Sequence, residues 1–281
     1  MKIAYIFLVH KDPKQVKRLI DSIRGTGDFY IHIDKKSDVV PFEKELNGYD
    51  DVFFTSKRYS VWWAGFSMIE GYMQVLFDAY NSEKQYDRFV LMTGQDYPLM
   101  TNEEIINEFV KNRNTEYVMA YNIKTSTVAT DKDKILRNWY FDFFMDNWRL
   151  AKYYRGLMYR LVTKNFIRKE LRVPLGNRMV DPYFGQMMSA FTRKGTELIL
   201  DTYLNDKKFN KAMKRVHAAV EIYWQTIIFN SPLRKNTIQN GEEHEITEHF
   251  GWAPLHYHNY DVDTSVYTKD DFEELKNAGV R

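Results

Sequence analysis

The segment YDRFVLMTGQDYPLMTN, residues 86–102, constrains the fold more than any other part of the chain. Residues 88–92 form a nearly continuous apolar run that is too short for an ordinary helix, which predicts a central strand covered on both faces in a parallel sheet. Gly94 and Pro98 interrupt regular structure just after it. Asp96 is therefore placed at the carboxyl end of a central strand, where open α/β sheets bind their ligands. A second interpretation stays open, in which Asp96 only bonds backbone NH groups of its own loop.

The first 122 residues are predicted to alternate strands with helices. Short apolar runs predict strands over 3–9, 29–33, 52–54 and 117–121. Helical spacing of apolar residues predicts helices over 15–23, 66–80 and 102–111. Thr101 with Glu104 fits a capping box at the start of the last helix. A strand–helix–strand unit of this length implies parallel pairing through a right-handed crossover, so we expect a mostly parallel α/β sheet flanked by helices.

Residues 123–180 are predicted to form a helical insertion that is rich in aromatic and basic residues. Between residues 147 and 172 there are eight Lys and Arg but only one acid, Glu170. One interpretation is a helix whose basic face is simply solvated. The other is a surface that contacts anionic lipid or an anionic acceptor.

Further elements are predicted in the second half of the chain: a strand over 183–191 and helices over 194–204 and 217–229. The last of these contains Glu221 in the otherwise apolar stretch HAAVEIYWQTIIF. Burying an isolated acid costs free energy because its charge loses water. Glu221 therefore either faces solvent or lies in a cleft with a raised pKa.

Composition and missing motifs exclude several classes of function. A net charge of +2 and the lack of a nucleic-acid motif argue against a nucleic-acid partner. The absence of cysteine removes disulfides and thiolate chemistry and fits a reducing compartment. No glycine-rich dinucleotide motif or phosphate-binding P-loop occurs. Because no stretch reaches about 18 apolar residues and the amino terminus lacks a cleavage site, we expect a cytoplasmic protein.

Five segments in order resemble the core-2/I-branching β-1,6-N-acetylglucosaminyltransferase family, which includes the peptide O-xylosyltransferases. They are YIFLVHKDPKQVKRLIDSI, FYIHIDKKS, VWWAGFSMIEG, YDRFVLMTGQDYPLMTNEEI and VEIYWQTI. Their spacing also matches, and they cover most of the chain outside 123–180. The resemblance implies one GT-A-like α/β domain over residues 1–281, with the segment 123–180 as a helical insertion.

The resemblance also implies an activity: inverting, metal-independent transfer of a sugar from a UDP-sugar. The expected sugar is N-acetylglucosamine and the expected acceptor a glycan or glycolipid, in surface polysaccharide synthesis. Most GT-A enzymes hold a divalent ion with an Asp-x-Asp motif, whereas the loop from Gly94 to Pro98 has one acid and supplies too few oxygen ligands. We therefore expect no metal and no cofactor beyond the donor. A lipid-linked acceptor would bring peripheral contact with the inner face of the membrane.

Individual residues take roles by the same resemblance. Glu221, in the segment VEIYW, would be the catalytic base that deprotonates the acceptor hydroxyl. Tyr97 and Trp224 would contact the acceptor. The donor site would be formed by Val9, His10, Asp34, Arg58, Trp63, Asp96 and His256. Among these, Asp34 would accept a hydrogen bond from the uracil imide NH, and Arg58 and Trp63 would close the site.

The chain departs from the family pattern at three points. The acid that precedes the base in the family is Val220 here, and a family arginine that neutralises the donor diphosphate corresponds to His256. A family Phe-Ala-Arg-Lys-Phe segment, whose lysine also holds the diphosphate, is missing because the sequence ends at Arg281. We therefore expect the natural chain to continue past this residue, or the donor to be held otherwise.

Two other functions remain in competition at this point. One is a catalytically weak relative that binds a sugar nucleotide or a glycan, suggested by His256 and the missing tail. The other is a nucleotidyltransferase on a similar sheet, which would need a cluster of metal-binding carboxylates that the sequence does not offer.

Overall fold

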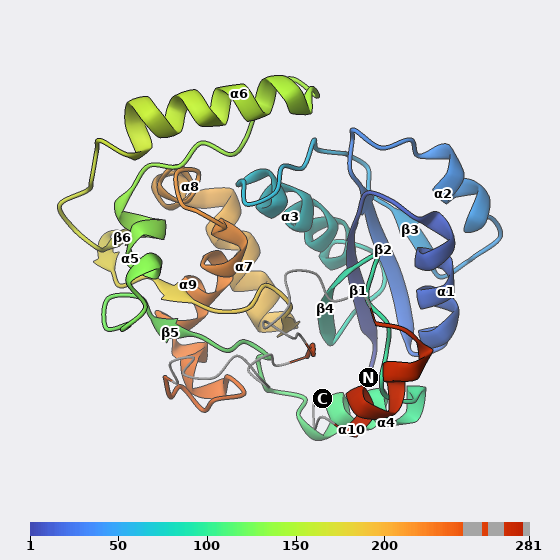
Figure 1. The fold of residues 1–281 in the computed structure, drawn as a ribbon. Coiled ribbons are helices and arrows are strands. Elements are labelled where there is room, and N and C mark those ends of the chain that lie inside the picture. Colours follow the sequence, from blue (N-terminus) through green and yellow to red (C-terminus); the bar gives the residue numbers. More distant parts are fainter. Residues whose placement is uncertain (244–254, 258–266, 278–281) are drawn as a thin grey trace.

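A five-stranded sheet forms the centre of the computed structural model, which describes residues 1–243, 255–257 and 267–277 (Figure 1). The strand order is β3-β2-β1-β4-β9. The strands span Ile3–Val9 (β1), Gly27–Ile33 (β2), Val52–Phe54 (β3), Arg88–Thr93 (β4) and Ala190–Thr192 (β9). The first four are parallel and β9 runs antiparallel to β4. The mostly parallel sheet that the sequence predicts is thus confirmed.

Helices cover both faces of this sheet. On one face lie α1 (Pro13–Ile23), α2 (Val40–Glu45) and α4 (Asn102–Lys111). On the other lies α3 (Ser67–Tyr80), with α7 (Arg193–Asn205) packed against α3 and α9 (Tyr223–Phe229) against α7 (Figure 1). Side chains of β1 alternate between the two cores, because successive residues of a strand point to opposite faces.

Local sequence accounts for the first helices. The predicted stripe on α1 is fully buried, and Pro13 occupies its first turn, where a missing NH costs nothing. At the start of α4, the Glu104 NH donates to the Thr101 hydroxyl and the Thr101 NH donates to the Glu104 carboxylate. The predicted capping box is therefore present.

Three predicted elements are divided in the structure. The predicted strand 117–121 is a single bridge from Tyr117 to Ala190 followed by β5 (Tyr121–Asn122). The predicted strand 183–191 is β8 (Tyr183–Phe184), paired with β5, and then β9. Between them Gly185 passes so close to Met119 that an added Cβ would lie 1.9 Å from its carbonyl oxygen. This close crossing of two chain segments interrupts both strands.

The predicted helix 217–229 is also divided, into a 3₁₀ turn at Ala219–Glu221 and the helix α9. Other elements of this half are α8 (Lys207–Met213) and a 3₁₀ turn at Pro232–Asn236. Near the end of the chain lie a 3₁₀ turn at Lys269–Asp271 and α10 (Phe272–Asn277), which is drawn beside α4 in Figure 1.

The insertion contains α5 (Ala129–Leu136), α6 (Trp148–Met158), a π-helical turn at Tyr159–Thr163, and a hairpin of β6 (Val173–Leu175) and β7 (Arg178–Val180). In Figure 1, α6 forms an arm above α8 and α3. Asp142 fastens the segment before this arm to the body, because its carboxylate accepts the NH groups of Phe66 and Ser67 at the start of α3. Residues 123–180 thus contain helices, as predicted, together with a short hairpin.

Candidate functional site

The carboxyl ends of β1 and β2 bring three of the predicted residues together. The Asp34 NH donates to the Val9 carbonyl at 2.8 Å, and the Ser37 hydroxyl donates to the His10 carbonyl at 2.6 Å. The Asp34 side chain is only 9% exposed and lies 2.8 Å from the Lys36 ammonium. Val9, His10 and Asp34 therefore form one group at the edge where open α/β sheets bind ligands.

Arg58 holds this group in place. Its guanidinium donates to the carbonyls of Ile33, Asp34 and Ser37 at 2.9, 2.8 and 2.6 Å. These bonds join the loop after β3 to the loop after β2, and the Val61 NH adds a 3.3 Å bond to the Asp34 carboxylate. Arg58 thus positions the Asp34 loop through backbone contacts.

The loop after β4 packs against the end of β1. A Cβ added to Gly94 would lie 2.9 Å from the Val9 side chain, so only glycine allows this approach. The Asp96 carboxylate accepts the NH and the hydroxyl of Thr93 at 2.6 and 3.0 Å. Asp96 therefore bonds groups of its own loop, as the second interpretation of this residue predicts. His256 lies at the same place, with Nε2 3.3 Å from the Asp96 carboxylate.

Glu221 ends a 3₁₀ turn that is joined to the Trp63 loop. The Ala218 NH donates to the Ala64 carbonyl at 3.2 Å, and both alanines have left-handed backbones, with φ of 51° and 60°. Such conformations cost free energy in a residue with a Cβ and gather at functional sites. The Glu221 NH donates to the Ala218 carbonyl at 2.9 Å, which fixes the turn.

The Glu221 carboxylate has a raised pKa. Its side chain is 37% exposed, but the surrounding protein removes part of its hydration, and this desolvation favours the neutral form. Lys134, from the insertion, opposes the shift from 3.8 Å, whereas Asp131 adds to it. The structure combines the two interpretations that the sequence left open: the Glu221 side chain is partly exposed, and its pKa is nevertheless raised.

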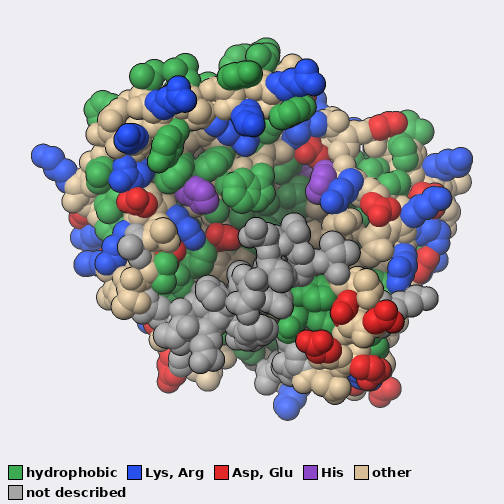
Figure 2. All heavy atoms as spheres, viewed as in Figure 1, with side chains coloured by type: hydrophobic (Ala, Val, Ile, Leu, Met, Phe, Trp, Pro, Cys, Tyr) green, Lys and Arg blue, Asp and Glu red, His purple; other side chains and the backbone are tan. Residues whose placement is uncertain are grey.

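Aromatic rings lie next to the turn that ends at Glu221. Trp63 is 70% exposed, and its ring centroid lies 6.1 Å from that of His217 and 6.2 Å from that of Phe141. Burial lowers the pKa of His217 to about 4, so its ring is neutral at neutral pH. In the upper half of Figure 2, apolar side chains lie between two His side chains, with acidic ones nearby. Lys134 and Phe141 were not predicted, because only tertiary packing brings the insertion next to Glu221. His217 lies four residues before Glu221 in the sequence and was not predicted either.

The two predicted acceptor residues are not placed beside the Glu221 carboxylate. Trp224 is fully buried, with its ring against Tyr72 and Phe191, so it packs the core and cannot contact a ligand directly. Tyr97 is 46% exposed, but its ring stacks under the Arg18 guanidinium of α1, on the other face of the sheet from α3 and α9. An acceptor role for Trp224 is thus corrected to a structural one.

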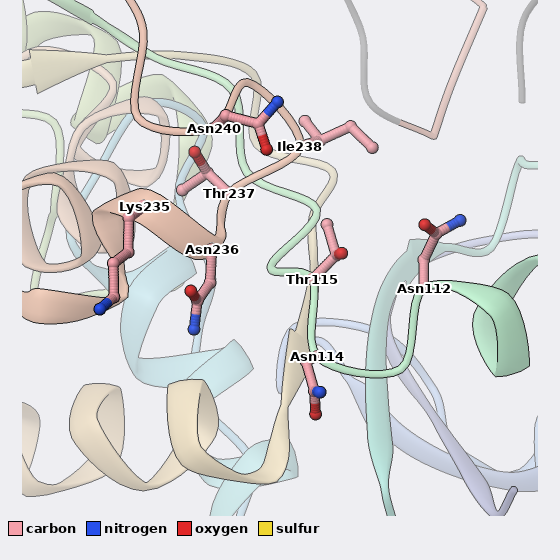
Figure 3. Close-up of a pocket in the computed structure, with 8 residues that line it drawn as sticks. All are labelled: Asn112, Asn114, Thr115, Lys235, Asn236, Thr237, Ile238 and Asn240. Carbon is pink, nitrogen blue, oxygen red and sulfur yellow. The ribbon is translucent and has the colours of Figure 1, made fainter.

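A pocket of about 410 Å³ lies elsewhere and contains none of the predicted residues. Asn, Thr and Lys side chains line most of it, from the loop after α4 and from residues 235–240 (Figure 3). Within residues 1–243, 255–257 and 267–277, no three His, Asp or Glu side chains gather as metal ligands. The helices in those same ranges are all too short or too polar to cross a bilayer.

The sheet and the polar groups at its carboxyl edge define an α/β protein of the kind that binds ligands at the ends of parallel strands. The chain belongs to the Core-2/I-Branching enzyme family, whose model matches residues 3–276. The family and the mostly parallel sheet together confirm the predicted GT-A-like α/β fold class.

Two human relatives illustrate the similarity. Xylosyltransferase 2 is 32% identical over 126 residues, which cover 43% of this chain and 15% of that protein. Probable beta-1,3-galactosyl-O-glycosyl-glycoprotein beta-1,6-N-acetylglucosaminyltransferase 7 is 25% identical over 234 residues, which cover 80% of this chain and 49% of that protein. The chain thus spans half or less of these relatives.

A solved structure, 4-diphosphocytidyl-2C-methyl-D-erythritol synthase from Anaerococcus prevotii, overlaps 73% of this chain and 77% of its own. Its TM-score of 0.34 and identity of 14% are too low to inform function.

Proposed function

We propose that the protein is an inverting glycosyltransferase that moves a sugar from a UDP-sugar to a glycan or glycolipid acceptor. The observation that carries this proposal is Glu221, a partly exposed carboxylate at the end of the 3₁₀ turn that is joined to the Trp63 loop, with a pKa raised by burial. Family membership supports the reaction class, and the names of both human relatives describe glycosyltransferases. The proposed sugar is N-acetylglucosamine, as in the name of the second relative.

In the proposed reaction, Glu221 accepts the proton of the acceptor hydroxyl as its oxygen attacks the anomeric carbon. The bond between that carbon and the UDP oxygen breaks, and UDP leaves with the electron pair on the opposite face, so the configuration inverts. Asp34 would accept the uracil imide NH at the end of β2, where its carboxylate is already held by the Val61 NH.

We propose that the reaction needs no metal. Both oxygens of Asp96, the one acid of the loop after β4, are engaged by Thr93, which supports a structural use of this carboxylate. The charge that develops on UDP must then be offset by cationic side chains. His256, beside Asp96, is one candidate, and Lys134, beside Glu221, is another.

The first prediction tests donor binding. UDP and UDP-sugars are expected to raise the melting temperature without added metal, and a ligand at 100 times its dissociation constant stabilises by about 2.7 kcal/mol. Differential scanning fluorimetry with and without EDTA measures this shift. If EDTA abolished the shift and manganese restored it, the metal-free proposal would be wrong. Donor binding without any transfer or donor hydrolysis would favour the catalytically weak relative instead.

The second prediction concerns pH. Because a base must be deprotonated and burial raises the pKa of Glu221, kcat/KM is expected to fall on the acid side with an apparent pKa above the ordinary 4.5. The affinity for UDP, measured by calorimetry over the same pH range, is expected not to fall together with kcat/KM. A rate that stays constant down to the ordinary glutamate pKa would remove Glu221 from the role of base.

For a lipid-linked acceptor, the proposed place of action is the inner face of the membrane. The reaction would then serve surface polysaccharide synthesis by a peripheral protein.

A further inference from the structure

The outward face of α6 and the turn after it exposes a row of large apolar side chains. They are Leu150 (45% exposed), Tyr153 (79%), Leu157 (55%) and Leu161 (58%). The spacing of three or four residues between them places them along one side of a helix, and Trp148, 64% exposed, lies on another side of the first turn. In Figure 2 the upper edge of the molecule, where α6 lies in Figure 1, carries apolar side chains interspersed with Lys and Arg.

Cationic side chains border this row. The exposed ones between residues 147 and 172 include Arg149, Lys152, Arg160, Lys164 and Lys169. The single acid of the segment, Glu170, lies 3.7 Å from Arg172, which offsets its charge. The outward face is therefore apolar and positively charged together, whereas an ordinary solvated helix carries polar side chains of both signs on its outer face.

The opposite side of α6 is fixed to the body. Ala151 is buried, and the Arg155 guanidinium donates to the Phe141 carbonyl at 2.9 and 2.7 Å while lying 5.2 Å from the centroid of the Trp62 ring. The apolar row consequently points away from the protein on a rigid support. Phe141 also contacts Trp63, so the arm lies next to the loop that is joined to the Glu221 turn.

We propose that this outward face of α6 docks on a membrane surface that contains anionic phospholipid. Trp and Tyr rings favour the boundary between water and lipid, and Lys and Arg are attracted to anionic headgroups. The apolar row would enter the headgroup region with the helix lying in the plane of the membrane. Docking itself does not depend on the proposed function. The further idea that docking presents a lipid-linked acceptor to Glu221 rests on the proposed function.

Cosedimentation with vesicles tests the proposal. Vesicles of three parts phosphatidylcholine and one part phosphatidylglycerol are expected to bind the protein at low salt, and vesicles of phosphatidylcholine alone to bind it much more weakly. Charge reversal at Lys152 and Arg160 should lower the partition constant by about fivefold or more for each residue. High salt should weaken binding of the wild type in the same direction.

The apolar row is tested by the double variant Tyr153→Glu and Leu157→Glu, which is expected to abolish vesicle binding. Both side chains are exposed, so folding should survive, and thermal melting verifies it. Val110→Glu is the matched control, since Val110 is 50% exposed on α4 and outside the arm. The proposal would be overturned if Val110→Glu weakened vesicle binding as much as the double variant does. It would also be overturned if the wild-type protein did not bind vesicles at low salt. Self-association through this face without lipid binding would overturn it as well. Because these assays need no donor and no turnover, a failed transferase assay does not affect them.

Discussion

Replacing Glu221 by glutamine is expected to slow sugar transfer by about 10²–10⁴-fold, the usual contribution of a general base. Glutamine keeps the shape of the side chain but cannot take the acceptor proton. Donor affinity should stay at the wild-type value, because the strand-end group around Asp34 is not altered. Radiolabelled or coupled transfer assays measure the rate, and calorimetry with UDP measures the affinity.

Glu70→Gln is the matched control for this substitution. Burial raises the pKa of Glu70 as it does for Glu221, and Glu70 has a lysine partner, Lys214, at a nearly equal distance of 3.7 Å. It lies on α3 and has no role in the proposed reaction, so its variant should transfer sugar at the wild-type rate. Equal rates for Glu221→Gln and Glu70→Gln would mean that a half-buried glutamate of this kind has no catalytic part.

Stability should change in the direction opposite to activity. The pKa of Glu221 is higher in the folded protein than in the unfolded chain, so ionising its carboxylate costs more free energy in the folded protein. The neutral side chain therefore contributes stability below the unfolded pKa, and this contribution is lost as the pH rises through the folded pKa. Glu221→Gln removes that cost. The variant is therefore expected to melt at a higher temperature than the wild type at neutral pH, with the difference shrinking as the pH is lowered.

Local patterns in the sequence predict the elements whose contacts lie close along the chain. The helix α1 follows from the spacing of Val16, Leu19 and Ile20, all fully buried, and α4 from the Thr101 cap. The strand β1 follows from its apolar run alone, because a strand covered on both faces needs no alternation.

The elements that local patterns misplace are those shaped by distant contacts. The close approach of Gly185 to Met119, which divides a predicted strand, involves segments far apart in the chain. The burial of Trp224 has the same origin, since the rings that cover it come from α3 and β9. The spacing within VEIYW indicates that Glu221 lies near Trp224, but it does not indicate which of the two side chains stays exposed.

The residues of the candidate site also fall into those that local patterns predict and those that distant contacts bring together. The residues at strand ends, Val9, His10 and Asp34, are found together because parallel strands end at one edge of a sheet. Lys134 approaches Glu221 from a different part of the chain, across an insertion whose packing no local pattern specifies. The sequence therefore predicts the grouping at the strand ends better than the surroundings of Glu221.

Asp34→Ala is expected to weaken UDP binding by about tenfold to a hundredfold, more than Asp96→Ala does. A hydrogen bond to a charged group contributes about 1.5–3 kcal/mol, and each 1.4 kcal/mol is a factor of ten in affinity. Both carboxylates are engaged by protein groups, Asp34 by Lys36 and Val61 and Asp96 by Thr93, so the expected difference rests on the position of Asp34 at the end of β2, beside Val9 and His10. Calorimetric titration of both variants with UDP compares them directly.

Loss of the Asp34 carboxylate also removes an acceptor for the Lys36 and Val61 NH groups, so a collapsed loop could imitate a lost ligand contact. Asp34→Asn separates the two effects, because its amide oxygen can still accept from those NH groups while the charge is gone. Asp38→Asn, at an exposed position of the same loop, controls for general disturbance. If the uracil imide bonds to Asp34, Asp34→Asn should lose UDP affinity with little change in melting temperature, and Asp38→Asn should lose neither. Unchanged UDP affinity in a folded Asp34→Asn variant would place the uracil somewhere other than the end of β2.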